Sequence, residues 1–147
     1  MKLTPMFKRS IVVLFVMAGL LACSKKNYDT KGCPPDQICT EEFASIGVQF
    51  VNKAFNTVKI KDLTVTNMRT NAAIVAKNVI DPGFAPDIYF IATDSNKSEF
   101  STQGDDIRIT ATDAATGKTA TAILKISGGC NCHILNLSGN NKIVFDE

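Results

Sequence analysis

The stretch DIRITATDAATGKTATAILKIS, residues 106–127, decides the fold class. Apolar side chains recur at every second position in both of its halves: Ile107, Ile109 and Ala111, then Ala120, Ala122, Leu124 and Ile126. Because successive side chains of a strand point to opposite faces, this period of two predicts two half-buried β-strands. The residues between them, DAATGK (113–118), predict a hairpin loop in which Gly117 takes a positive φ.

Short apolar segments of the same kind lie on both sides of this hairpin. The strand candidates are FASIGVQFV (43–51), TVKIKDLTVT (57–66), DIYFIAT (87–93), CHILNL (132–137) and KIVFD (142–146). The segment TNAAIVAKNVI (70–80) comes nearest to a helix, but its Val, Ile and Asn content disfavours one. Short strands separated by turn residues predict an all-β fold, a single antiparallel β-sandwich of about seven strands.

The N-terminus has the pattern of an export signal. A basic segment, MKLTPMFKRS, precedes the apolar run IVVLFVMAGLLA (11–22). As a helix this run is about 18 Å long, too short for a hydrocarbon core of about 30 Å, which indicates a cleaved signal. It ends in LLAC, which resembles a bacterial lipobox and predicts cleavage before Cys23 and lipidation of that cysteine. The alternative is an ordinary signal peptide with a coincidental cysteine.

These features predict the domain organisation and the location. Residues 1–22 are the expected lipoprotein signal peptide, 23–32 a flexible tether and 33–147 the β-sandwich domain. After cleavage the chain keeps 13 of its 16 basic residues and all 14 acidic ones, a formal net charge of −1. No cationic surface argues for nucleic acid. Ser24, in place of an Asp, fits sorting to the outer membrane, with the lipid-anchored domain facing the periplasm.

Four further cysteines, Cys33, Cys39, Cys130 and Cys132, predict two disulfides, because an exported domain folds in an oxidising compartment. If Cys130 and Cys132 lie on a strand, their Cα atoms are about 6.6 Å apart, near the upper limit for a bridge. We therefore favour two long-range bridges into CPPDQIC (33–39), each worth roughly 4 to 5 kcal/mol at most. The alternative pairs Cys33 with Cys39.

The segment SGGCNCHI (127–134) also contains the only histidine, His133. Cys130, Cys132 and His133 are ligand types for zinc or copper, so a periplasmic metal-binding protein is the alternative function. On a strand, however, His133 points away from the face of Cys132. We expect these cysteines to form structural disulfides and not to take part in chemistry, and we expect the protein to have no cofactor.

Enzyme chemistry is not expected from the remaining motifs. The only histidine lies beside a cysteine that is expected to be oxidised, so it is a poor candidate for the base of a hydrolytic triad. Glu41 and Glu42 point in opposite directions on a strand, which does not suit acid and base catalysis on one substrate. DSNKSE (94–99) and GDD (104–106) could offer oxygen ligands to calcium, but they lack the spacing of an EF-hand loop, so polar turns are the expectation.

Two segments resemble those of small bacteroidete-type outer-membrane lipoproteins of unknown function. These are ICTEEFASIGV (38–48) and CNCHILNLSGNNKIVFD (130–146). The resemblance implies an immunoglobulin-like or transthyretin-like β-sandwich and offers no catalytic residue. With the predicted anchor, it leads us to expect a membrane-anchored, non-enzymatic structural or binding module whose sheet edges or end loops dock an envelope protein partner.

Overall fold

The structure is a computed structural model, and it describes residues 32–80, 83 and 87–145. The predicted signal peptide, the lipidation site Cys23 and nearly all of the predicted tether lie outside the described residues. The chain divides into two compact units, Met1–Pro35 and Asp36–Glu147, and the fold below is that of the second. In the part of the chain that the structure describes, no helix is both long enough and apolar enough to cross a membrane.

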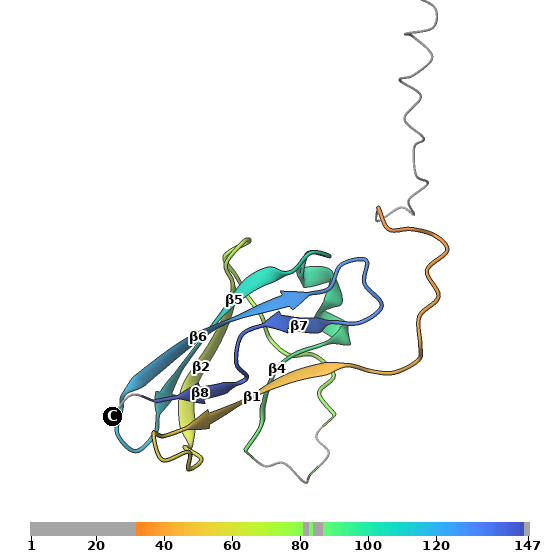
Figure 1. The fold of residues 1–147 in the computed structure, drawn as a ribbon. Helices are drawn as coiled ribbons and strands as arrows, with labels where there is room; N and C mark the ends of the chain where they lie inside the picture. Colours follow the sequence, from red (N-terminus) through yellow and green to blue (C-terminus); the bar gives the residue numbers. More distant parts are fainter. Residues whose placement is uncertain (1–31, 81–82, 84–86, 146–147) are drawn as a thin grey trace, which may run out of the picture. The chain divides into compact units, whose positions relative to one another are not determined.

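Eight strands of the described residues form two sheets (Figure 1). The three-stranded sheet has the order β4-β1-β8, with β1 at Ser45–Val51, β4 at Tyr89–Thr93 and β8 at Lys142–Val144. The five-stranded sheet has the order β3-β2-β5-β6-β7, with β2 at Ile60–Asn67, β3 at Ala72–Ala73, β5 at Asp105–Asp113, β6 at Thr119–Ser127 and β7 at Leu135–Ser138. A 3₁₀ helix, η2 at Asp94–Glu99, follows β4 directly.

The hairpin predicted from residues 106–127 is present as β5 and β6. The two strands pair antiparallel from Asp105↔Ile126 to Thr112↔Thr119 without a break in register. In the loop, Gly117 has a φ of +73°, as predicted, and Asp113 accepts hydrogen bonds from the Ala115 N–H and the Thr116 hydroxyl. These local contacts set the geometry of the turn, which together with the apolar alternation of the two strands specifies the register of the pair.

The apolar faces of both sheets meet in one core. From the three-stranded sheet come Ile46, Val48, Phe50, Ile91 and Ile143; from the five-stranded sheet come Val65, Ile107, Ile109, Ala111, Leu124 and Ile126. The side chains predicted to face inward on β5 are completely buried, whereas Arg108 between them is exposed. The predicted all-β sandwich is therefore confirmed, and its two layers are joined by burial of apolar area.

Three details differ from the prediction. First, β8 pairs with β1 in parallel, whereas an antiparallel sandwich was predicted, because the chain leaves β7 in one sheet and enters the other sheet at β8. Second, the two-residue strand β3 raises the count of described strands to eight. Third, β7 begins at Leu135, so residues 132–134, predicted to begin this strand, lie before it, and residues 130–133 form turns and bends.

Candidate functional site

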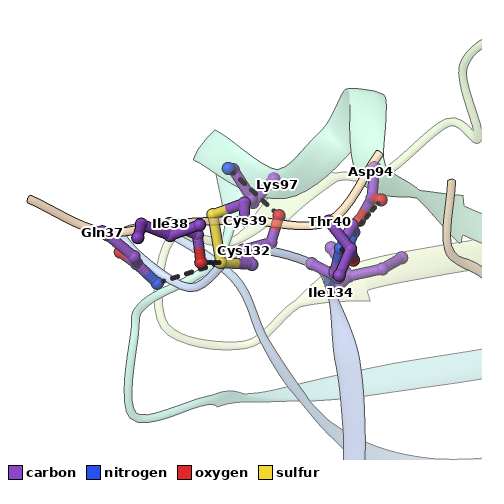
Figure 2. The surroundings of a disulfide bond; sticks show 9 residues. Gln37, Ile38, Cys39, Thr40, Asp94, Lys97, Cys132 and Ile134 are labelled. Carbon is purple, nitrogen blue, oxygen red and sulfur yellow. Dashed lines mark hydrogen bonds and ion pairs between the residues drawn. A yellow bond between two sulfur atoms is a disulfide. The ribbon is translucent and has the colours of Figure 1, made fainter. Parts of the chain in front are cut away.

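The disulfide between Cys39 and Cys132 joins positions 93 residues apart, with Cα atoms 5.2 Å from each other (Figure 2). Cys33 and Cys130 each take part in a disulfide as well. The prediction of a long-range bridge into CPPDQIC is confirmed for Cys39, and the alternative that paired Cys33 with Cys39 is wrong. The bridge attaches the segment before β1 to the turn between β6 and β7.

The turn at residues 128–134 is built by hydrogen bonds to η2 and to the segment after it. The N–H groups of Gly128 and Gly129 donate to the carbonyls of Ser101 and Lys97, and the Cys130 N–H donates to the Thr102 hydroxyl. A Cβ on Gly128 would lie 2.5 Å from the Lys97 carbonyl oxygen, so this close approach requires glycine. These bonds replace the predicted strand pairing, so the alternation along a strand from which we expected Cys132 and His133 to face opposite ways does not apply.

His133 bridges a carboxylate and a hydroxyl. Its Nδ1 lies 2.7 Å from Oδ2 of Asp94, and its Nε2 lies 3.0 Å from Oγ1 of Thr40. The imidazole is mostly buried, since 19% of the side chain is exposed, and Thr40 is exposed. Thr40 directly follows Cys39 and His133 directly follows Cys132, so the disulfide holds the hydroxyl and the imidazole side by side.

Asp94 is the first residue of η2 and accepts hydrogen bonds from three directions. Besides His133, the backbone N–H groups of Ala44 and Ile134 donate to it, each over 2.8 Å. Burial raises the pKa of Asp94, but the bonds from Ala44, His133 and Ile134 lower it further than burial raises it, and the net direction is down. The carboxylate is therefore ionised at neutral pH and ties together η2, the residue before β1 and the turn before β7.

The sequence did not single out Asp94 or Thr40 as partners of His133. Asp94 is 39 positions from His133 and Thr40 is 93 positions from it, so no local periodicity relates them. The only available signal was that Thr40 and His133 each directly follow one of the two cysteines that pair. Asp94 appeared in the sequence only as a potential calcium ligand, and its oxygens are instead occupied by His133 and two backbone N–H groups.

Two other acidic groups considered for metals, Glu99 and Asp105, are also engaged. Glu99 pairs with Lys77 and accepts from Asn96, while Asp105 accepts from Asn67, Arg69 and the Ser101 N–H. The Cys132 sulfur is bonded to Cys39 and is not a thiolate, so a metal site of Cys130, Cys132 and His133 would require reduction. Within residues 32–80, 83 and 87–145, no group of three or more His, Cys, Asp or Glu residues could hold an ion.

An open apolar groove lies elsewhere on the sandwich, beside β2 and β4. Its lining includes Leu63, Val65, Ile74, Val75, Phe90 and Ile91, and it contains no titratable side chain. A groove of this composition suits packing or an apolar contact and supplies no acid or base. Glu41 and Glu42 are exposed and lie before β1 rather than on a strand.

Comparison with known protein families, with curated proteins and with solved structures finds no match for this chain. The interpretation of its function therefore rests on its own residues and on their arrangement.

Proposed function

We propose that this protein is a lipoprotein of the cell envelope, held at the outer membrane by lipid on Cys23, whose periplasm-facing β-sandwich is a non-enzymatic structural or binding module. The observation that carries the proposal is the Cys39–Cys132 disulfide. A structural bridge of this kind persists in an oxidising compartment and is rare in the cytosol. The N-terminal sequence, with its basic segment and the apolar run ending in LLAC, supplies the route of export.

Lipid on Cys23 gives the module a durable attachment. Each buried methylene contributes about 0.8 kcal/mol, so two or three acyl chains hold a protein at the bilayer far longer than one chain does. The polar residues between Cys23 and the cysteine-bearing segment then act as a spacer. This arrangement suits a protein that works within the reach of a flexible spacer from the membrane.

The strand β7 is the best candidate for the docking edge. It is the last strand of the five-stranded sheet, and all four of its residues are exposed. Leu135 and Leu137 on β7 and Ile123 on the neighbouring β6 are each about half exposed. An open edge beside exposed apolar side chains suits an extended segment of an envelope protein, which would pair its backbone with β7 and cover the three side chains.

The anchor is tested by expressing the full chain in a Gram-negative host supplied with an alkyne fatty acid. We expect the wild-type chain to incorporate the label and to partition with the outer membrane, and Cys23→Ser to lose both properties. Ser24→Ala changes the adjacent residue without removing the thiol, and this control keeps the label. Labelling that survives Cys23→Ser contradicts the proposed anchor.

The docking edge is tested separately with a photo-crosslinking residue at Leu137. We expect one reproducible envelope protein to be captured there, and its capture to be lost when Leu135→Asp is added. The control site is Lys61, an exposed position on β2, which β5 and β6 separate from β7 in the same sheet. Capture of the same protein from Lys61, or no capture from Leu137, contradicts a partner at β7.

A further inference from the structure

Thr40, His133 and Asp94 form a chain of hydroxyl, imidazole and carboxylate. The Oγ1–Nε2 distance is 3.0 Å and the Nδ1–Oδ2 distance is 2.7 Å. Asp94 is fixed in place by the N–H groups of Ala44 and Ile134, so the orientation of the imidazole is fixed in turn. In general, such a chain is recognised by geometry and by the role of each group rather than by position in the sequence.

The proton positions follow from these contacts. Next to an ionised carboxylate, Nδ1 of neutral His133 carries the proton and donates it to Asp94. The lone pair of Nε2 then faces Thr40, whose hydroxyl donates to it. A hydroxyl that donates to an oriented neutral imidazole is activated for attack, because the imidazole accepts the proton as the oxygen forms its new bond.

The disulfide and the exposure of Thr40 complete the arrangement. The Cys39–Cys132 bond adjoins both reacting residues and keeps them paired. Thr40 is exposed, so a reagent in solution reaches its Oγ1, whereas His133 is mostly buried behind it. The exposed hydroxyls of Thr110 and Thr121 offer a comparison within the same protein, because they bond to each other, 3.1 Å apart, without an imidazole.

We propose that Thr40 is a covalent acceptor site for an activated acyl ester, with His133 as the base and Asp94 as the positioning residue. Oγ1 forms a bond to the acyl carbon, and the bond from that carbon to the leaving oxygen breaks with its electron pair. The hydroxyl proton passes to Nε2 and then to the leaving oxygen. The products are a Thr40 ester and a free alcohol or phenol, and nothing is oxidised or reduced. One acyl group per chain requires no turnover, so the site goes beyond the proposed module without making it an enzyme.

The test uses the full chain in detergent, with its disulfides intact, and p-nitrophenyl acetate as the probe. We expect the release of nitrophenolate to accompany acetylation of the peptide that contains Thr40. His133→Gln slows this acetylation on the order of 100-fold, because the base is lost. Thr40→Val abolishes it and Thr40→Ser retains it. The peptides that contain Thr110 and Thr121 stay unmodified.

Two results would overturn the proposal. One is acetylation of Thr40 at the same rate in His133→Gln and in the wild-type chain. The other is nitrophenolate release that persists in Thr40→Val, which would make His133 itself, or surface lysines, the nucleophile. Urea unfolding of each variant shows whether it is folded. The Thr40→Val and Thr40→Ser pair decides the question even if His133→Gln is unstable, since Thr40 contributes one exposed contact.

Discussion

Asp105 illustrates how one carboxylate holds several segments. It begins β5, its side chain is 1% exposed, and it accepts hydrogen bonds from Arg69, Asn67 and the Ser101 N–H. Its pKa lies well below the usual range, chiefly because Arg69 donates to it, while burial acts in the opposite direction. A depressed pKa in the folded state means that the ionised carboxylate stabilises the fold.

The pH dependence of stability follows from this sign. The stabilisation is complete well above 3.8, the ordinary pKa of an aspartate carboxyl, and is lost as the pH falls below that value. We expect Asp105→Asn to lower the free energy of unfolding by about 2 kcal/mol at pH 7, since a charge-assisted bond is lost. Urea unfolding at pH 7 and pH 3 should show this difference shrinking at the lower pH.

The neighbouring Asp106→Asn is the control for this experiment. Asp106 is exposed on the same strand, and its replacement should change stability little at either pH. Asp94 and Asp113 also have lowered pKa values, so they add to the acid sensitivity of all three proteins equally. A difference between the wild-type protein and Asp105→Asn that stays constant from pH 7 to pH 3 would contradict the assignment.

At the scale of elements, the strands were predictable and the turn beside the disulfide was not. The inward faces of β1, β5 and β6 follow from a period of two, because the pleat of a strand imposes that period on any half-buried sheet. The turn at residues 128–134 is defined instead by bonds to Lys97, Ser101 and Thr102, which lie about 30 positions earlier. No local pattern encodes such partners, so the contact between His133 and Asp94 could not be predicted either.

Two glycines with positive φ allow the cost of backbone strain to be measured apart from the cost of a steric clash. Gly117 has a φ of +73° and nothing within 4 Å of the place where a Cβ would stand. Gly139 has a φ of +98°, and a Cβ there would lie 2.6 Å from the Ile123 carbonyl oxygen and 2.9 Å from the Leu124 Cα. We expect Gly117→Ala to cost about 1 kcal/mol from strain alone, and Gly139→Ala to cost on the order of 3 kcal/mol. Equal losses in urea unfolding would show that the close approach at Gly139 does not matter.

At the scale of the whole sandwich, β1 is the central strand of the smaller sheet. The segment that leads into β1 is held by a disulfide and side-chain contacts, not by hydrogen bonds between strands. The segment before it, from Gln37 to Phe43, contains no strand and is exposed along its length. Its attachments are the Cys39–Cys132 bond, the Thr40 contact to His133 and weaker polar contacts such as that of Gln37. The bridge thus supplies the constraint that this segment lacks in secondary structure.

Removing the bridge should therefore have a global effect and a local one. Closing a loop of 93 residues restricts the unfolded chain, for which the entropy model gives about 4 to 5 kcal/mol as an upper figure. We expect the double variant Cys39→Ser, Cys132→Ser to have a lower urea midpoint, and its segment before β1 to be released from the sandwich.

A protease specific for glutamate should then cut after the exposed Glu41 or Glu42 much faster than in the wild-type protein. The control is Cys23→Ser, which removes the proposed lipidation site and keeps the bridge, and it should match the wild-type chain in both measurements. If the double variant also matches, the hydrogen bonds of Thr40 and Asp94, together with the remaining disulfide of Cys33, hold the segment, and the Cys39–Cys132 bond has no separate mechanical role.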